Sequence, residues 1–278
     1  MAGVADADIC LLQFNPRRFQ PSAISHQRSA IDGVRVLSLD TTTREGSVAL
    51  VEDDRIVEVR RGDASRSHAE RLPGDLLSLV TAHRLTFGDV DVFAVAAGPG
   101  SFTGLRIGIA TIQGLAVTTG RRVVAVPVLD ALAQAASVGE PGTGNRAPGT
   151  LVAAWVDAHR REVFAEAFRV TSAPPFESTR LEIVDAIRVG PPTAILDDLR
   201  RTPSSARMVF AGDGAVLYAA EIRAALPAAE IAAASPVAGA IGLMAAACAR
   251  RGATIDPAAI QPLYVRRPDA VIAREAQS

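Results

Sequence analysis

Residues 94–116, AVAAGPGSFTGLRIGIATIQGLA, lead from an apolar strand through a glycine turn directly into a helix. A strand, a glycine turn and a helix N-terminus form the usual phosphate-binding arrangement of α/β proteins. The turn completes neither standard motif, because Thr103 stands where G-x-G-x-x-G needs its third glycine and no lysine follows as in a Walker loop. Gly98, Gly100 and Ser101 therefore fit two interpretations equally well: a phosphate site, or a sharp turn in which Ser101 or Thr103 caps the helix.

Strands and helices alternate on both sides of this turn. Ser67 and Glu70 fit a capping box at the start of one helix, and Gly120 is placed to end the next. In the first half, the apolar pattern predicts strands at 34–40, within 47–62, at 90–98 and at 121–127, and helices at 68–84, 103–119 and 128–136. In the second half, it predicts a hairpin of strands at 151–158 and 162–170, helices at 193–201, 215–225 and 236–251, and a strand at 208–211. This order predicts an α/β protein with two lobes.

The chain divides at segments that lack apolar periodicity. Residues 1–33 are expected to be a disordered N-terminal extension that the fold does not need. Residues 139–149, GEPGTGNRAPG, are the strongest linker candidate because they are rich in Gly and Pro. The predicted organisation is therefore a first lobe at 34–138, a smaller second lobe at 150–268 and a tail at 269–278.

Composition narrows the function classes. The formal net charge is -1. The arginines come as scattered pairs, which is typical of solvent-exposed ends of helices and strands. A protein that binds nucleic acid without a partner usually has a basic excess or a basic stripe instead. Cys10 and Cys248 form neither a disulfide framework nor a zinc spacing, which fits a reducing cytoplasm. Residues 231–249 carry no charge, but they consist mainly of Ala and Gly and contain Pro236, so a packed helix is expected there and not a membrane span.

The helix after the glycine turn is unusually rich in small residues. Gly104, Gly108 and Gly114 lie inside it, and an interior glycine costs about 1 kcal/mol relative to alanine. Several in one helix indicate a close approach to another element. The spacing leaves open whether that element belongs to the same chain or to another subunit.

Five motifs resemble the TsaB family, also called YeaZ. AGPGSFTGLRIG is its long central signature, and VLSLDTTTREGSVAL, SHAERLP, GDGA and PLYVRRP occur in the family's order between residue 34 and about residue 268. The resemblance implies an actin-like fold of the ASKHA (ribonuclease H-like) class with a reduced second lobe. It also implies a cytoplasmic dimerisation subunit of the bacterial machinery that makes threonylcarbamoyladenosine in tRNA. The catalytic relative, TsaD, transfers threonylcarbamoyl from its adenylate to the adenosine 3′ of the anticodon, and an ATPase, TsaE, completes the complex.

The residues depart from a catalytic subunit at two motifs. TsaD-like proteins bind metal through H-x-x-x-H on the first long helix, whereas His68 is followed here by Leu72, so no metal is expected. The actin-like D-x-G phosphate turn reads Asp40-Thr41-Thr42, where Asp40 is also suited to holding the turn.

Nucleotide binding stays open at this point, while ATP turnover and a required cofactor are not expected. An adenine nucleotide would bind weakly or be shared at an interface. The candidate phosphate or nucleotide residues are Asp40, Thr41, Gly98, Gly100, Ser101, Gly212, Asp213 and Gly214.

The resemblance further implies that helices 68–84 and 103–119 pair with the same helices of a partner as a four-helix bundle. The predicted interface residues are Leu72, Leu76, Leu79, Gly104, Leu105, Gly108 and Ile112. The expected partners are a TsaD-type subunit in a heterodimer, a TsaE-type ATPase, tRNA indirectly through the complex, and a second copy as a homodimer. The alternatives are an actin-like ATPase or kinase, a metallopeptidase-like enzyme acting alone, and a nucleotide-sensing homodimer.

Overall fold

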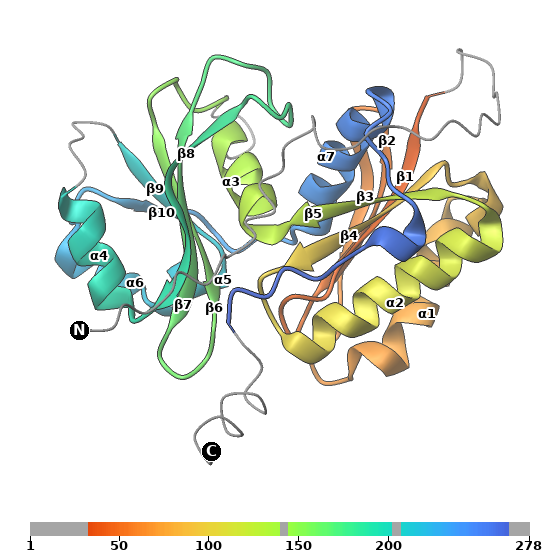
Figure 1. Cartoon of the computed structure of the whole chain (residues 1–278), viewed down its shortest axis with the longest axis horizontal. Coiled ribbons are helices and arrows are strands. Elements are labelled where there is room, and N and C mark those ends of the chain that lie inside the picture. The colour runs from red at the N-terminus through yellow and green to blue at the C-terminus, as the bar shows by residue number, and fades with distance from the viewer. Residues whose placement is uncertain (1–32, 140–143, 202–206, 267–278) are drawn as a thin grey trace, which may run out of the picture.

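The computed structural model describes residues 33–139, 144–201 and 207–266, which form two α/β lobes side by side (Figure 1). Most of the predicted N-terminal extension, part of the predicted linker and the predicted tail lie outside the described residues. No helix in the described segments has the length and apolar character needed to cross a bilayer.

The first lobe is built on a five-stranded sheet in the order β3-β2-β1-β4-β5. Its strands are β1 (Arg35–Asp40), β2 (Ser47–Glu52), β3 (Arg55–Arg61), β4 (Val92–Gly98) and β5 (Arg122–Pro127). β2 runs antiparallel to β1 and β3, and β4 runs parallel to β1 and β5. β4 is buried along its whole length, which explains its unbroken apolar sequence.

Two helices cover one face of this sheet, α1 (His68–Ala82) and α2 (Phe102–Thr119), with the short η2 (Phe87–Asp89) between them. The predicted capping box of Ser67 and Glu70 is present. Ser101 caps α2 by accepting a hydrogen bond from the Gly104 amide, and Gly120 ends α2 in the left-handed conformation, with φ of 67°. The local signals for both helices are therefore confirmed.

The second lobe repeats the topology of the first. Its strands are β6 (Leu151–Asp157), β7 (Val163–Val170), β8 (Leu181–Gly190), β9 (Met208–Ala211) and β10 (Glu230–Ile231), and the sheet order is β10-β9-β6-β7-β8. Counted from β8, the order and the strand directions match those of the first sheet. This two-fold βββαβαβα arrangement is the actin-like fold that was expected.

The second half departs from the sequence prediction at several elements. The short β10 and η3 (Pro257–Ala259) were not predicted, and neither was β8, whose residues alternate neither cleanly in polarity nor in burial. The single helix predicted at 215–225 is two, α5 (Asp213–Leu217) and α6 (Ala219–Ala225), because Tyr218 leaves the helical conformation with φ of -104° and ψ of 29°. The remaining elements are α3 (Val128–Val138), α4 (Pro192–Arg201) and α7 (Ala238–Arg250).

The lobes exchange one helix each. α3 follows the first sheet in sequence but contacts β6, whereas α7 follows the second sheet and packs on β1, β2 and β4. α7 lies so close to the first sheet that a Cβ on Gly242 would be 2.5 Å from a methyl carbon of Val51. Residues 238–248 are all buried, so the uncharged segment is a packed helix, as predicted. One hydrophobic cluster accordingly spans both lobes.

Candidate functional site

Three turns meet between the lobes, where the strands β1, β4 and β6 end. They are residues 41–46, 98–101 and 157–162. Carboxyl ends of parallel strands are the usual place for ligands in α/β sheets. The turns border a cavity of about 690 Å³, whose lining residues are Thr42, Thr43, Arg44, Ser65, Arg66, Ser67, His68, Ser101, Thr103, Gly104, Ile107, Asp157, His159 and Asp213.

Asp40 holds the first turn and does not line the cavity. Its carboxylate is 3% exposed and accepts hydrogen bonds from the Thr42 amide at 2.8 Å and the Thr42 hydroxyl at 2.6 Å. Burial raises the pKa of Asp40. Asp40 therefore has the structural role that its position at a strand end suggested.

The glycine turn packs edge to edge against the first turn. A Cβ on Gly100 would lie 2.5 Å from Cβ of Thr42, and the Ser101 amide donates to the Thr42 carbonyl at 2.8 Å. Gly98 has φ of +114°, a conformation that glycine adopts readily. Gly100 is thus required for the close approach between the two turns, and Gly98 is required by its positive φ and by the Leu263 carbonyl beside it. These roles satisfy the turn interpretation of this motif without a ligand.

The Gly212-Asp213-Gly214 turn packs against the end of β6. One oxygen of Asp213 accepts hydrogen bonds from the Asp157 amide at 3.1 Å and from the Gly214 amide at 2.8 Å. Burial raises the pKa of Asp213, and the carboxylate of Asp157 adds to the effect. A Cβ on Gly212 would lie 2.1 Å from the Trp155 carbonyl oxygen.

The eight candidate nucleotide residues are therefore only partly brought together. Ser101 and Asp213 line the cavity between the lobes, whereas Asp40 is buried beneath it. Gly212 lines a separate cavity of about 130 Å³ beside α3. The cavity between the lobes also presents the carboxylates of Asp157 and Asp213, and negative charges there oppose the binding of a polyphosphate.

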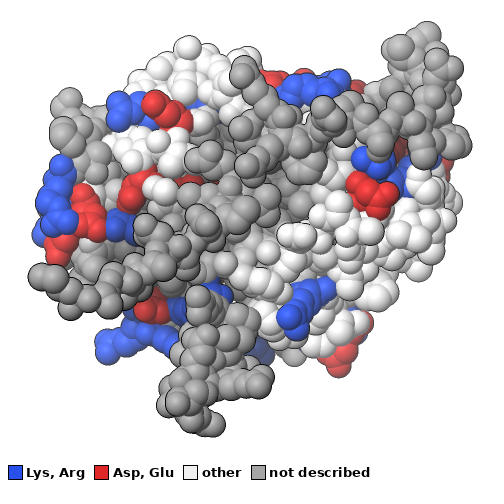
Figure 2. All heavy atoms as spheres, viewed as in Figure 1, with Lys and Arg blue, Asp and Glu red and all other residues white. Residues whose placement is uncertain are grey.

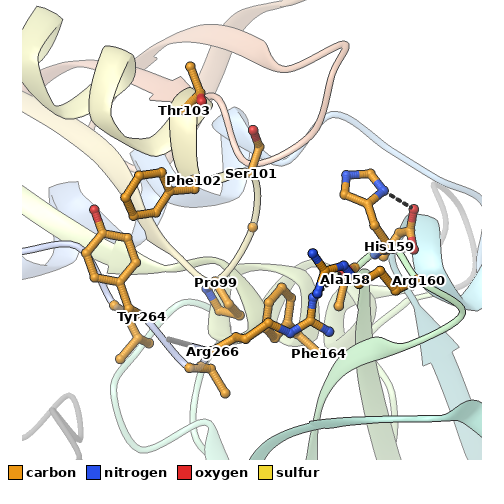
Figure 3. A pocket seen from close by; sticks show the side chains of 14 residues that line it. Pro99, Ser101, Phe102, Thr103, Ala158, His159, Arg160, Phe164, Tyr264 and Arg266 are labelled. Atoms are coloured by element: carbon orange, nitrogen blue, oxygen red, sulfur yellow. Dashed lines mark hydrogen bonds and ion pairs between the residues drawn. The ribbon is translucent and has the colours of Figure 1, made fainter. Parts of the chain in front are cut away.

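The turn between β6 and β7 was not among the predicted site residues. His159, Arg160 and Arg161 all adopt positive φ, between 55° and 63°. His159 and Asp157 border both the cavity described above and a second one of about 480 Å³ (Figure 3). The repeated topology was the signal that would have found them, since 157–162 occupies in the second lobe the place that 41–46 occupies in the first.

The second cavity is lined by both lobes and by the C-terminal segment. Its lining residues are Pro99, Gly100, Ser101, Phe102, Thr103, Asp157, Ala158, His159, Arg160, Phe164, Leu263, Tyr264, Val265 and Arg266. Arg266 donates to the Ala158 carbonyl at 3.0 Å and pairs with Glu162. Leu263 donates its amide to the Ala97 carbonyl at 2.7 Å. Residues 263–266 therefore connect the first lobe to the second.

His68 is a structural residue of the α1 N-terminus. Its Nε2 lies 2.9 Å from the Thr43 carbonyl oxygen and its Nδ1 lies 2.9 Å from Nη2 of Arg71. A carbonyl only accepts and a guanidinium only donates, so the ring is neutral with its proton on Nε2. Burial also lowers the pKa of His68. Across 33–139, 144–201 and 207–266, no group of three or more His, Cys, Asp or Glu is placed to hold a metal ion.

The predicted interface residues lie inside one chain, and their assignment to a partner surface is wrong. Leu72, Leu76, Leu79, Leu105 and Ile112 are at most 1% exposed. A Cβ on Gly104 would lie 2.1 Å from the Thr41 carbonyl oxygen, and one on Gly108 would lie 2.2 Å from the Thr41 hydroxyl. The leucines form the core under the helices, and the two glycines let α2 approach the turn after β1.

The outer face of the same two helices is small, weakly polar and exposed. Leu77 is 52% exposed and Val117 is 68% exposed. An ideal Cβ on Gly74 or Gly114 meets no described atom within 4 Å. The exposed positions that form this outer face are Pro73, Gly74, Leu77, Ser78, Thr81, Ala110, Gly114, Val117 and Thr118. We call it the α1/α2 face.

Charge is distributed in small mixed groups on the face shown in Figure 2. Several members of the arginine pairs make ion pairs with nearby acids, among them Arg60 with Glu58 at 2.6 Å, Arg61 with Glu45 at 2.8 Å, and Arg251 with Glu177 at 2.6 Å. The interpretation of these arginines as element edges agrees with this geometry.

Comparisons with known proteins agree with the motifs. The family model described as TsaD, tRNA N6-adenosine threonylcarbamoyltransferase, matches residues 62–273. An uncharacterized protein of Mycobacterium tuberculosis is 33% identical over 238 residues, which are 84% of this chain and 93% of that protein. The tRNA threonylcarbamoyladenosine biosynthesis protein TsaB of Escherichia coli is 34% identical over 131 residues, 47% of this chain and 53% of that protein.

A solved structure supports the same relationship. YeaZ from Pseudomonas aeruginosa superposes with a TM-score of 0.64 at 27% identity, covering 83% of this chain and 99% of that one. The shared fold therefore extends over nearly all described residues of both lobes.

Proposed function

The chain belongs to the TsaB (YeaZ) family, and the TsaD family model also matches most of it. We propose that it acts in tRNA threonylcarbamoyladenosine biosynthesis as a non-catalytic partner subunit. Its partner is a TsaD-type enzyme, which transfers threonylcarbamoyl from the adenylate to the tRNA adenosine 3′ of the anticodon. A TsaE-type ATPase completes the complex.

The observation that carries the non-catalytic role is the environment of His68. In a metal-binding H-x-x-x-H helix, both imidazoles need a free ring nitrogen on the same side. Here the ring nitrogens of His68 face the Thr43 carbonyl and the Arg71 guanidinium, and Leu72, at the position of the second histidine, is buried in the core. These residues do not fit a metal, which argues against the metallopeptidase-like alternative.

The α1/α2 face supports pairing with another subunit. Side chains as small as those of Gly74, Ala110 and Gly114 permit close helix approach, while Leu77 and Val117 supply apolar area. A four-helix bundle formed through this face uses the two helices that the resemblance implied, α1 and α2. The residues in contact with the partner are then the exposed ones of the α1/α2 face and not the buried leucines. The same face serves a heterodimer with the TsaD-type subunit or a homodimer.

Co-purification tests this proposal directly. The chain is expressed with the TsaD-type protein of its own organism, and tRNA modification is assayed with and without it. Capture of the TsaD-type protein and modification that depends on this chain are expected. A purified chain that modifies tRNA or turns over ATP repeatedly by itself would contradict the non-catalytic role.

Weak binding of an adenine nucleotide is a second candidate function. The cavity of about 690 Å³ between the lobes has room for it, and the carboxylates of Asp157 and Asp213 in the lining oppose the phosphates and keep the affinity low. A nucleotide there would act as a sensed ligand, shared with a partner or held by a homodimer, and not as a required cofactor. Calorimetric titration with ATP tests it, since binding without turnover is the expected result.

A further inference from the structure

Three side chains are stacked at the edge of the second cavity. The Arg106 guanidinium lies 3.9 Å from the centre of the Phe102 ring, and the rings of Phe102 and Tyr264 are 5.1 Å apart with an interplanar angle of 33°. Nε of Arg106 also donates to the Tyr264 hydroxyl at 3.2 Å. Arg106 and Phe102 belong to the first turns of α2, and Tyr264 belongs to the C-terminal segment, so the stack joins residues 158 positions apart. We call it the Arg106 stack.

The Arg106 stack is accessible and its charge is not neutralised. Tyr264 is 39% exposed, and Arg106 is exposed as well. No carboxylate of the described residues pairs with Arg106, in contrast to Arg266, which pairs with Glu162. A guanidinium is weakly hydrated and combines stacking with phosphate recognition. An exposed arginine on an aromatic ring, without an acidic partner, is therefore suited to an anionic ligand with a flat ring.

The cavity beside the Arg106 stack is lined by further aromatic and arginine side chains and by the carboxylate of Asp157. In Figure 3, Phe102 and Tyr264 lie on one side of it, and Arg160, Arg266 and Phe164 lie towards the other. The Arg266 guanidinium stands 5.8 Å from the centre of the Phe164 ring. The volume of about 480 Å³ falls in the range of about 300–1,000 Å³ that is usual for small-ligand sites. One nucleotide unit is a ligand of this size and chemistry.

The position of Tyr264 is set by the backbone before any ligand arrives. Leu263 bonds to Ala97 through its amide, and its carbonyl oxygen would lie 2.8 Å from a Cβ on Gly98. Gly98 therefore admits the C-terminal segment to the end of β4. A ring held in this way loses little conformational entropy on binding.

We propose that the Arg106 stack and the adjoining cavity bind an unpaired nucleotide of RNA, with its base stacked on Tyr264 and its phosphate paired with Arg106. Bases of single-stranded RNA stack on aromatic and arginine side chains, whereas paired bases are not available for this. The choice of RNA over other sources of a nucleotide rests on the proposed function. The near-zero net charge of the chain makes this a local contact and not a broad basic surface.

Fluorescence anisotropy of the full chain alone tests the proposal. The probes are a labelled RNA hairpin with an unpaired loop and an RNA duplex of equal length, with AMP as competitor. Tyr264→Ala is expected to weaken hairpin binding by about 5- to 150-fold, the range for one stacked base. Tyr264→Phe, which keeps the ring, retains binding. Arg106→Ala lowers the salt dependence by about one phosphate contact, whereas Arg223→Ala, which removes an exposed arginine on α6, does not.

The outcomes separate this inference from the proposed function. Hairpin affinity unchanged in both Tyr264→Ala and Arg106→Ala, with melting temperatures also unchanged, overturns the RNA site. The RNA site is also overturned if the wild type binds the duplex as tightly as the hairpin, if free AMP competes as well as unlabelled hairpin does, or if the wild type does not bind the hairpin. Capture of the TsaD-type protein is measured in a separate experiment. If the TsaD-type protein is not captured, the proposed subunit role is contradicted, while the RNA-binding measurement still tests the RNA site.

Discussion

Single glycines decide how closely the turns between the lobes approach one another. The glycine-rich helix indicated a close contact, but small residues are needed equally for a turn of the same chain and for a second subunit. The atom beside Gly104 resolves this, since a Cβ there would lie 2.1 Å from the Thr41 carbonyl oxygen. Spacing in a sequence does not reveal which atom lies opposite, so residue roles at this site required the structure.

Gly104→Ala is expected to lower the free energy of unfolding by about 1–3 kcal/mol, because the backbone of Thr41 has to move. Gly114→Ala is the matched control on the exposed side of α2, where alanine should stabilise the helix by roughly 0.5–1 kcal/mol. Urea unfolding of both variants measures the difference. Two stabilising alanines would contradict the close approach of α2 to the turn after β1.

Glu166 makes stability depend on pH. It is 9% exposed on β7, and burial raises its pKa from 4.5 to about 8, with the carboxylates of Asp130 and Asp185 adding to the effect. The folded state therefore holds this proton between pH 4.5 and about 8, while the unfolded state releases it. Stability is present in full below this window and falls as pH rises through it.

Glu166→Gln is expected to reduce the loss of stability with rising pH and to melt at a higher temperature than the wild type at pH 8. Part of the loss remains in the variant, because burial also raises the pKa of Asp130, to about 7. Glu182→Gln, at an exposed position of β8, is the control and should follow the wild type. Thermal melting across pH 5–8 checks both. A wild type whose stability rises with pH over this interval would show that the Glu166 carboxyl is ionised in the fold.

Helices α1 and α2 each have an inner and an outer face, and adjacent residues separate their roles. Leu76 is 1% exposed and Leu77 is 52% exposed. Leu76→Asp should prevent folding, because it places an unpaired charge in the core. Leu77→Asp should stay folded, with an unchanged circular dichroism spectrum, and lose capture of the TsaD-type partner. A folded Leu77→Asp protein that still captures the partner would show that the α1/α2 face is not the pairing surface.

Elements with local signals were predicted best. The capping box of Ser67 and Glu70 and the left-handed Gly120 specify the start of α1 and the end of α2 from a few neighbouring residues. β8 lacks such signals, because it is an edge strand whose alternation is interrupted by register shifts against β7. The leucine stripe of α1 was found correctly, but a helical stripe shows only that one face is buried and not what covers it.

The whole molecule is tied together by the exchange of α3 and α7. The repeat of one topology in both lobes and the crossing of their last helices arise from contacts distant in sequence, which no local pattern contains. The resemblance implied two lobes, yet the core that joins them takes buried residues from both halves of the chain. The cavities lie at this junction between the lobes. The sequence therefore predicted only those site residues that belong to a recognisable motif at the end of a strand, such as Ser101 and Asp213.

Because each lobe is covered by a helix from the other, α3 or α7, we expect the two lobes to unfold together. Without α7, the first sheet would expose the face that α7 buries. Without α3, β6 of the second sheet would lose the helix that covers it. Trp155 is the single tryptophan, is fully buried and lies in the second lobe, so its fluorescence reports that lobe alone. Circular dichroism reports both lobes. In urea the two signals should change in one coincident transition, as two-state unfolding requires. A circular dichroism curve with two steps, only one of which coincides with Trp155 fluorescence, would show that each lobe is stable without the helix of the other.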